Sequence, residues 1–90
     1  MELEFPHQHG SLHAGVIAAV LDSACGYAAF SLMAPDAAVL TVEFKLNCLA
    51  PAKGERSFAV GTVKKPGRTL TVTQGDVYAE SNGQRKLVAT

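Results

Sequence analysis

The sequence predicts an α+β domain in which an antiparallel sheet curls around one long buried helix. Three observations lead to this prediction. Residues 14–33 form an alanine-rich stretch without proline that is too long for one strand. Apolar residues then recur at every second position from residue 40 to residue 48, and turn-forming residues separate the segments that follow. A helix followed by an antiparallel meander is typical of α+β domains.

The predicted helix covers about residues 13–34. Alanine favours the helical conformation, and Pro35 with Asp36 ends the helix. Apolar residues occupy nearly the whole circumference, which indicates a buried helix rather than a surface one. We therefore expect the sheet to curl around it, because no other part of the chain can cover it.

Four strands are expected after the helix, and a short strand candidate precedes His7. The clearest strand signal is the alternation of apolar and polar residues over residues 40–48. The other three strands are expected at residues 56–64, 69–80 and 85–90. Gly75, inside one of them, marks a bulge or a point of close approach.

Turn signals separate these strands. Residues 51–54 and 65–67 contain proline and glycine, and Asn82-Gly83 is the strongest short hairpin signal in the chain. The edge strands of such a sheet need covering, and pairing with a second subunit is the obvious way to provide it. We therefore expect a homo-oligomer.

Length and composition narrow the class of protein. Ninety residues make one small domain, residues 1–90, which looks short at both ends. Hydrophobic residues make up 48% of the chain and charged residues 18%, against roughly 25% charged in soluble domains. This composition argues against disorder. The formal net charge is zero, so no basic field attracts nucleic acid or an anionic membrane.

Signals for membrane insertion and secretion are missing from the sequence. The longest apolar run covers residues 14–21 and is shorter than the roughly 18 residues that a membrane span needs. Residues 1–4 do not resemble a signal peptide, and the two cysteines, Cys25 and Cys48, do not suggest a disulfide framework. We expect a cytoplasmic protein without nucleic-acid or membrane partners.

The candidate site begins in the loop of residues 5–15, which contains histidine, serine and glycine and leads directly into the helix. The start of a helix presents free backbone N–H groups and the positive end of the dipole. Such a place suits a carbonyl oxygen that gains negative charge. Asp22 is the only charged residue between Ala14 and Pro35, which indicates a general base; alternatively, Asp22 with Ser23 caps or breaks the helix.

Other polar residues of this region have simpler interpretations. His7, His9 and His13 could form a metal site, but no cysteine or second carboxylate completes the set, so we expect no metal. His13 is expected to fix the entry into the helix through backbone hydrogen bonds. Cys25 lies among small residues, which favours core filling over a nucleophilic role.

The triplet His13-Ala14-Gly15, followed by Asp22, resembles the hotdog-fold acyl-CoA thioesterases of the phenylacetic-acid-degradation type, within the 4-hydroxybenzoyl-CoA thioesterase-like superfamily. The family pattern is His-Gly-Gly with an acidic residue nine positions after the histidine. In this chain alanine replaces the first glycine. Residues 39–51 and 67–70 also match, so that the resemblance covers nearly the whole chain.

The resemblance implies a role for each residue of the site. Asp22 is implied to act as general base or nucleophile toward the thioester. The backbone amides of Ala14 and Gly15 are implied to polarise the thioester carbonyl. The polar side chains that orient the water or the carbonyl are implied to be His7 and Thr41.

The family also implies an assembly and a substrate. Its site lies between two protomers, which implies a dimer or a dimer of dimers (a homotetramer). Acyl-CoA is the implied substrate, and no separate cofactor is needed because CoA belongs to the substrate. The cationic turn containing Lys65, Gly67 and Arg68 either holds the CoA phosphates or is an ordinary solvated turn. The residues expected to line an acyl pocket are Tyr27, Phe30, Leu32 and Met33.

Two other functions are compatible with the predicted fold. One is a non-catalytic hotdog module that binds acyl-CoA or serves assembly. The other is a dehydratase or hydratase, which the sequence disfavours because it lacks the Gly-Asp-x-Asn-Pro stretch of those relatives. Within the thioesterase hypothesis, an aryl and a short or medium alkyl group both suit an apolar pocket.

Overall fold

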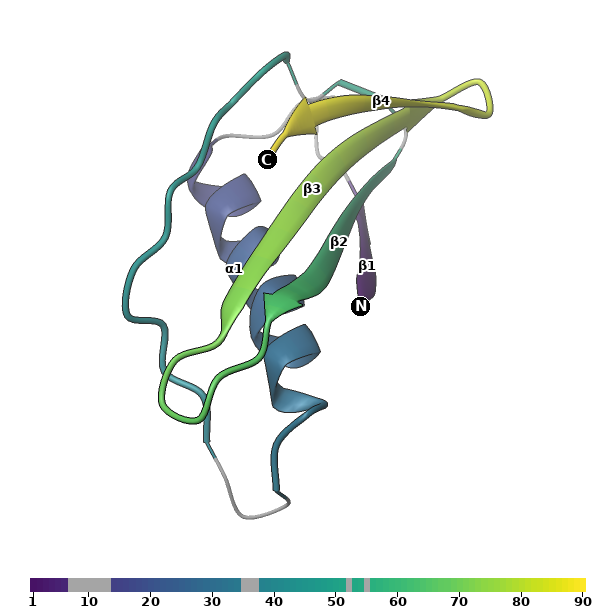
Figure 1. The fold of residues 1–90 in the computed structure, drawn as a ribbon. Coiled ribbons are helices and arrows are strands. Elements are labelled where there is room, and N and C mark those ends of the chain that lie inside the picture. Colours follow the sequence, from purple (N-terminus) through teal and green to yellow (C-terminus); the bar gives the residue numbers. More distant parts are fainter. Residues whose placement is uncertain (7–13, 35–37, 52, 55) are drawn as a thin grey trace.

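A computed structural model describes residues 1–6, 14–34, 38–51, 53–54 and 56–90 of the chain. Within these residues, the regular elements are four antiparallel strands and one helix (Figure 1). The elements in chain order are β1 (Glu2–Pro6), α1 (Ala14–Phe30), β2 (Arg56–Lys65), β3 (Val72–Ser81) and β4 (Gln84–Ala89). The strands lie side by side in the order β1-β2-β3-β4, and each neighbouring pair is antiparallel. The predicted α+β class is confirmed.

The helix α1 packs against one face of the sheet, mainly on β2 and β3 (Figure 1). It lies within the predicted range of 13–34 but ends at Phe30. One stripe of α1, which includes Ile17, Leu21, Ala24 and Ala28, is buried. The sheet covers one side of this helix, and apolar side chains on the other side, such as Tyr27 and Phe30, are exposed in the single chain.

A pair of glycines sets the distance between the helix and the sheet. Gly61 of β2 and Gly75 of β3 are register partners. A Cβ atom at Gly61 would lie 2.5 Å from the backbone oxygen of Ala24, and one at Gly75 would lie 2.8 Å from Sγ of Cys25. The close approach expected at Gly75 is confirmed, whereas the register shift of this strand pair lies elsewhere, between Val63 and Lys65.

The hairpin between β3 and β4 follows its sequence signal. Asn82 and Gly83 have φ values of 52° and 77°, which is the pattern of a type I′ turn. This turn is compatible with the right-handed twist of the two strands. The predicted strands match β2, β3 and β4 within three residues at each end, and the short strand expected before His7 is β1.

The predicted strand at residues 40–48 is wrong as a regular strand. Asn47 and Thr90 exchange two backbone hydrogen bonds of 2.8 and 3.0 Å, and Cys48 forms an isolated bridge with Ala89. Residues 40–46 extend beyond Thr90, and no strand of the described residues lies beside them (Figure 1). Their alternating apolar side chains are therefore exposed, as at Leu40 (86%) and Val42 (75%).

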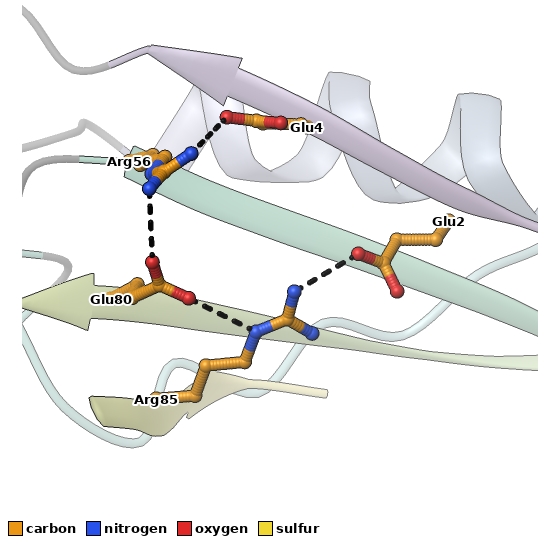
Figure 2. A network of polar contacts seen from close by, with 5 residues as sticks. All are labelled: Glu2, Glu4, Arg56, Glu80 and Arg85. Atoms are coloured by element: carbon orange, nitrogen blue, oxygen red, sulfur yellow. Dashed lines mark hydrogen bonds and ion pairs between the residues drawn. The ribbon is translucent and has the colours of Figure 1, made fainter. Parts of the chain in front are cut away.

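The opposite face of the sheet carries a network of charged side chains from all four strands (Figure 2). Arg56 lies 3.4 Å from Glu4 and 3.4 Å from Glu80, and Arg85 lies 3.4 Å from Glu80 and 3.1 Å from Glu2. The Arg85 guanidinium also lies 3.7 Å above the centre of the Phe58 ring. The hydrogen bond to Glu2 is the main cause that raises the pKa of Arg85.

None of the described residues forms a helix long and apolar enough to cross a membrane.

Substitution of Gly61 by alanine is expected to destabilise the fold by about 1–3 kcal/mol, because the new methyl group overlaps the backbone of α1. Urea unfolding followed by circular dichroism measures this loss. Lys64→Gln, at an exposed position of the same strand, is the control and should change stability by less than about 0.5 kcal/mol. Equal stability of Gly61→Ala and wild type would contradict the close packing of α1 on β2.

Substitution of Glu80 by glutamine is expected to lower Tm at low ionic strength, because Glu80 bridges Arg56 and Arg85. The difference from wild type should shrink in about 1 M NaCl, which screens charge interactions. Lys86→Gln is the control, since Lys86 forms no ion pair with any described residue. A difference in Tm that is independent of salt would show that packing, and not charge, gives Glu80 its effect.

Candidate active site

A cavity of about 870 Å³ lies between α1, the extended segment 38–47 and the residues that lead into and begin β3. Six residues of α1 line it: Ala18, Leu21, Asp22, Cys25, Gly26 and Ala29. They recur at spacings of three and four, which places them along one stripe of the helix. This stripe lies beside the stripe that packs on the sheet, so α1 serves the core and the cavity at once.

Asp22 faces this cavity from the middle of α1. Its Oδ1 accepts a hydrogen bond of 2.7 Å from the hydroxyl of Thr41, although the two residues are 19 positions apart in the sequence. Because α1 continues without a break from Ala14 to Phe30, the alternative that Asp22 caps or breaks the helix is wrong. The fold thus brings two of the predicted site residues into direct contact.

The start of α1 lies away from Asp22. Ala14 is the first residue of the helix, and Gly15 follows in the exposed first turn. Eight residues at a rise of about 1.5 Å each separate Ala14 from Asp22 by about 12 Å along the axis. One carbonyl group therefore cannot contact both the Ala14 amide and the Asp22 carboxylate of the same chain.

The three histidines lie outside the described residues. The roles predicted for His7 and His13, and the metal alternative that included His9, therefore stay predictions. Within the described ranges, no group of three His, Cys, Asp or Glu side chains is arranged to hold a metal ion.

Cys25 lines the same cavity one turn after Asp22 and is half-buried. Burial raises the pKa of the Cys25 thiol, and the nearby carboxylate of Asp22 adds to this effect, against an opposing hydrogen bond from Thr73. The thiol therefore stays protonated near neutral pH, which makes it a poor nucleophile. Sequence reasoning assigned Cys25 to the core, whereas its spacing of three from Asp22 places it on the cavity wall.

The cationic turn expected to contact phosphates connects β2 with β3. Lys65 ends β2, and Gly67 and Arg68 follow in the exposed turn, where the Gly67 amide donates a 3.3 Å hydrogen bond to the hydroxyl of Thr71. The next residues, Thr69 to Gly75, line the Asp22 cavity. In the described part of the chain, no carboxylate forms an ion pair with Lys65 or Arg68.

The residues predicted for an acyl pocket are divided between different surfaces. Met33 lines the Asp22 cavity. Tyr27 and Leu32 line a second cavity of about 300 Å³ on another side of α1, and Phe30 is exposed and lines neither. The apolar residues that line the larger cavity include Leu40, Val42, Leu70 and Val72.

Comparison with known proteins identifies the relatives of this fold. A family model described as the thioesterase superfamily matches residues 9–86. A thioesterase family protein from Silicibacter pomeroyi, of known crystal structure, is 56% identical, with a TM-score of 0.92 over 98% of this chain and 69% of that one. No match was found among curated proteins.

Two more distant crystal structures share the fold. A Bacillus halodurans protein solved with CoA is 24% identical, with a TM-score of 0.89 over 98% of this chain and 60% of that one. A Shewanella oneidensis protein related to the thioesterase superfamily is 23% identical, with a TM-score of 0.79 over 98% of this chain and 69% of that one.

Alkylation by iodoacetamide near neutral pH is expected to modify Cys48 much faster than Cys25. Cys48 is exposed, whereas Cys25 is half-buried and its raised pKa leaves little thiolate. Peptide mapping by mass spectrometry measures both rates in one sample. The rate at Cys25 should increase only at a pH above the normal range of thiol ionisation. Rapid modification of Cys25 at neutral pH would contradict this environment and reopen its role as a nucleophile.

Proposed function

The chain belongs to the thioesterase superfamily and has its hotdog fold, and we propose that it hydrolyses an acyl-CoA thioester to a carboxylate and free CoA. The observation that carries the proposal is the Asp22–Thr41 pair at the wall of a large cavity. A carboxylate held in this way suits attack on a thioester. The proposed substrates are aryl and short or medium alkyl esters, as in the phenylacetic-acid-degradation type.

Asp22 is proposed to activate the attack. Thr41 donates its hydroxyl hydrogen to Oδ1, which leaves Oδ2 free to accept a proton from water or to attack the thioester carbonyl directly. In the first route, water adds to the carbonyl carbon, the C–S bond breaks, and the proton taken by Asp22 passes to the leaving thiolate. In the second route, Asp22 attacks the carbonyl carbon and the C–S bond breaks, which gives an acyl-Asp22 anhydride and the CoA thiolate. Water then hydrolyses the anhydride to the carboxylate and free Asp22 and supplies the proton that the thiolate takes up.

The carbonyl oxygen gains negative charge in both routes and needs hydrogen-bond donors. The backbone amides of Ala14 and Gly15, at the positive end of α1, are the proposed donors. Because about 12 Å separates Ala14 from Asp22 along α1, we propose that these amides come from a second protomer. His7 and His13 precede this helix start and would accompany it into the shared site.

A shared site requires a dimer, and we propose a dimer or a dimer of dimers. The exposed apolar side chains of α1 and of segment 40–44 are the surfaces available to bury. Burial of such a surface stabilises an assembly through the hydrophobic effect.

The cationic turn is the proposed contact for CoA. Lys65 and Arg68, on either side of Gly67, are exposed cationic side chains that suit phosphate groups. The Bacillus halodurans relative, which was solved with CoA, supports a CoA ligand for this fold. The proposed reaction uses no metal or redox cofactor, since the carboxylate, the amides and water suffice.

Substitution of Asp22 by asparagine is expected to lower kcat/KM for acyl-CoA hydrolysis by about 100- to 10,000-fold, because the amide cannot accept a proton or attack. The measurement is free-thiol release from phenylacetyl-, hydroxybenzoyl-, short-alkyl and medium-alkyl-CoA. Glu4→Gln, which removes an exposed carboxylate on the opposite face of the sheet, is the control and should retain activity.

The outcomes separate the competing hypotheses. Activity that persists in Asp22→Asn would contradict the assignment of the base. No thiol release from any ester, in folded and oligomeric wild type, would instead support a non-catalytic module that binds acyl-CoA. Hydrolysis in ¹⁸O-labelled water under single-turnover conditions tests the nucleophilic route, because label enters Asp22 only when water attacks the Asp22 carbonyl of the anhydride.

A further inference from the structure

Gly26 lies in the middle of α1, where glycine costs about 1 kcal/mol relative to alanine. Neither packing nor backbone conformation requires a glycine at this position. A Cβ atom at Gly26 would meet no atom within 4 Å, in contrast to Gly61 and Gly75, where a Cβ would overlap neighbouring atoms. The backbone of Gly26 is helical and has no positive φ, so any residue could adopt it.

The missing side chain of Gly26 leaves space in the cavity. Gly26 lines the same wall as Asp22 and lies four residues later, so that the two positions are one helical turn apart on one stripe. A larger side chain at this position would project into the cavity beside the Asp22 carboxylate. The absence of a side chain therefore widens the cavity next to the reacting atoms.

From this space we infer that Gly26 determines which acyl groups the enzyme accepts, and that it admits acyl groups with an aromatic ring or a branch close to the thioester carbonyl. The inference rests on the proposed hydrolysis at Asp22. Gly26 is one helical turn from Asp22, so it lies beside the atoms that flank the thioester carbonyl. These atoms are the first acyl carbons on one side and the cysteamine unit of CoA on the other. The cysteamine unit is unbranched and identical in every acyl-CoA, so only a bulky acyl group needs the extra width.

The opposite wall of the cavity suits such a group. Leu70 and Val72 line this wall together with segment 38–47, and both have exposed apolar side chains. An aromatic or branched acyl group between these side chains and the bare backbone of Gly26 would remove apolar surface from water on both sides. A straight alkyl chain fits the same space but does not fill it.

The test compares Gly26→Ala and Gly26→Val with wild type on a matched panel of esters. The panel pairs benzoyl- and isobutyryl-CoA with the straight-chain butyryl- and hexanoyl-CoA. We expect Gly26→Ala to lower kcat/KM for the bulky esters by about 10- to 100-fold relative to the straight-chain esters, and Gly26→Val to enlarge this change in selectivity. Gly26→Ala should also raise Tm, because alanine favours the helix.

Ser23→Ala is the matched control. Ser23 is an exposed residue of the same helix, and it does not line the cavity. The substitution should increase helix propensity without changing selectivity, so it separates a general effect of helix stability from an effect on the site.

The possible failures are distinguishable. An active wild type whose selectivity is unchanged by Gly26→Ala would overturn the role of Gly26 and leave the proposed hydrolysis intact. An equal loss of kcat/KM for all esters would also overturn the inference, because it would show that Gly26 contacts the CoA part of the substrate and not the acyl group. A folded wild type that hydrolyses no ester would overturn the proposed function and this inference together.

Discussion

The close approach of α1 to the sheet is the constraint on which the other features depend. Gly61 and Gly75 lie opposite each other on β2 and β3, and the absence of their side chains lets the backbone of α1 rest on the strands near Ala24 and Cys25. This contact fixes the rotation of the helix about its axis. Once Ala24 faces the glycine pair, Asp22 lies about 160° around the helix from it, on the side of the segment that carries Thr41.

Much of the fold was predictable because its signals are local. The alanine-rich helix, the type I′ hairpin at Asn82-Gly83 and the glycine at a close approach each depend on neighbouring residues in the sequence. One prediction was wrong because it depends on distant residues. Residues 40–46 alternate as a strand should, but an alternating segment forms a regular strand only when another strand lies beside it, and none of the described strands does. The helix is apolar all round, but the sheet covers only one of its sides.

The candidate site was also predictable only in part. The isolation of Asp22 in an apolar helix singled it out in the sequence, and the family resemblance placed Thr41 in the same site, where the structure finds both. Tyr27 and Phe30 lie on other sides of α1 than the Asp22 cavity of the single chain. At about 100° per residue, Tyr27 lies about 140° and Phe30 about 80° around the helix from Asp22, whereas Gly26 lies within about 40°. This rotation was available in the sequence and would have pointed to Gly26 and Cys25. The histidine loop lies outside the described residues, so its roles stay predictions.

The charged network on the outer face has a consequence for the order of folding events. The ion pair between Glu2 and Arg85 joins residues 83 positions apart, and its side chains come together only after β2 and β3 have assembled between β1 and β4. Contacts that close so long a loop form late, because their entropic cost is recovered only when the intervening strands are in place. Interactions that are absent from the transition state slow unfolding without accelerating folding. We therefore expect the network to slow unfolding of the assembled sheet and to have little effect on the rate at which the sheet forms.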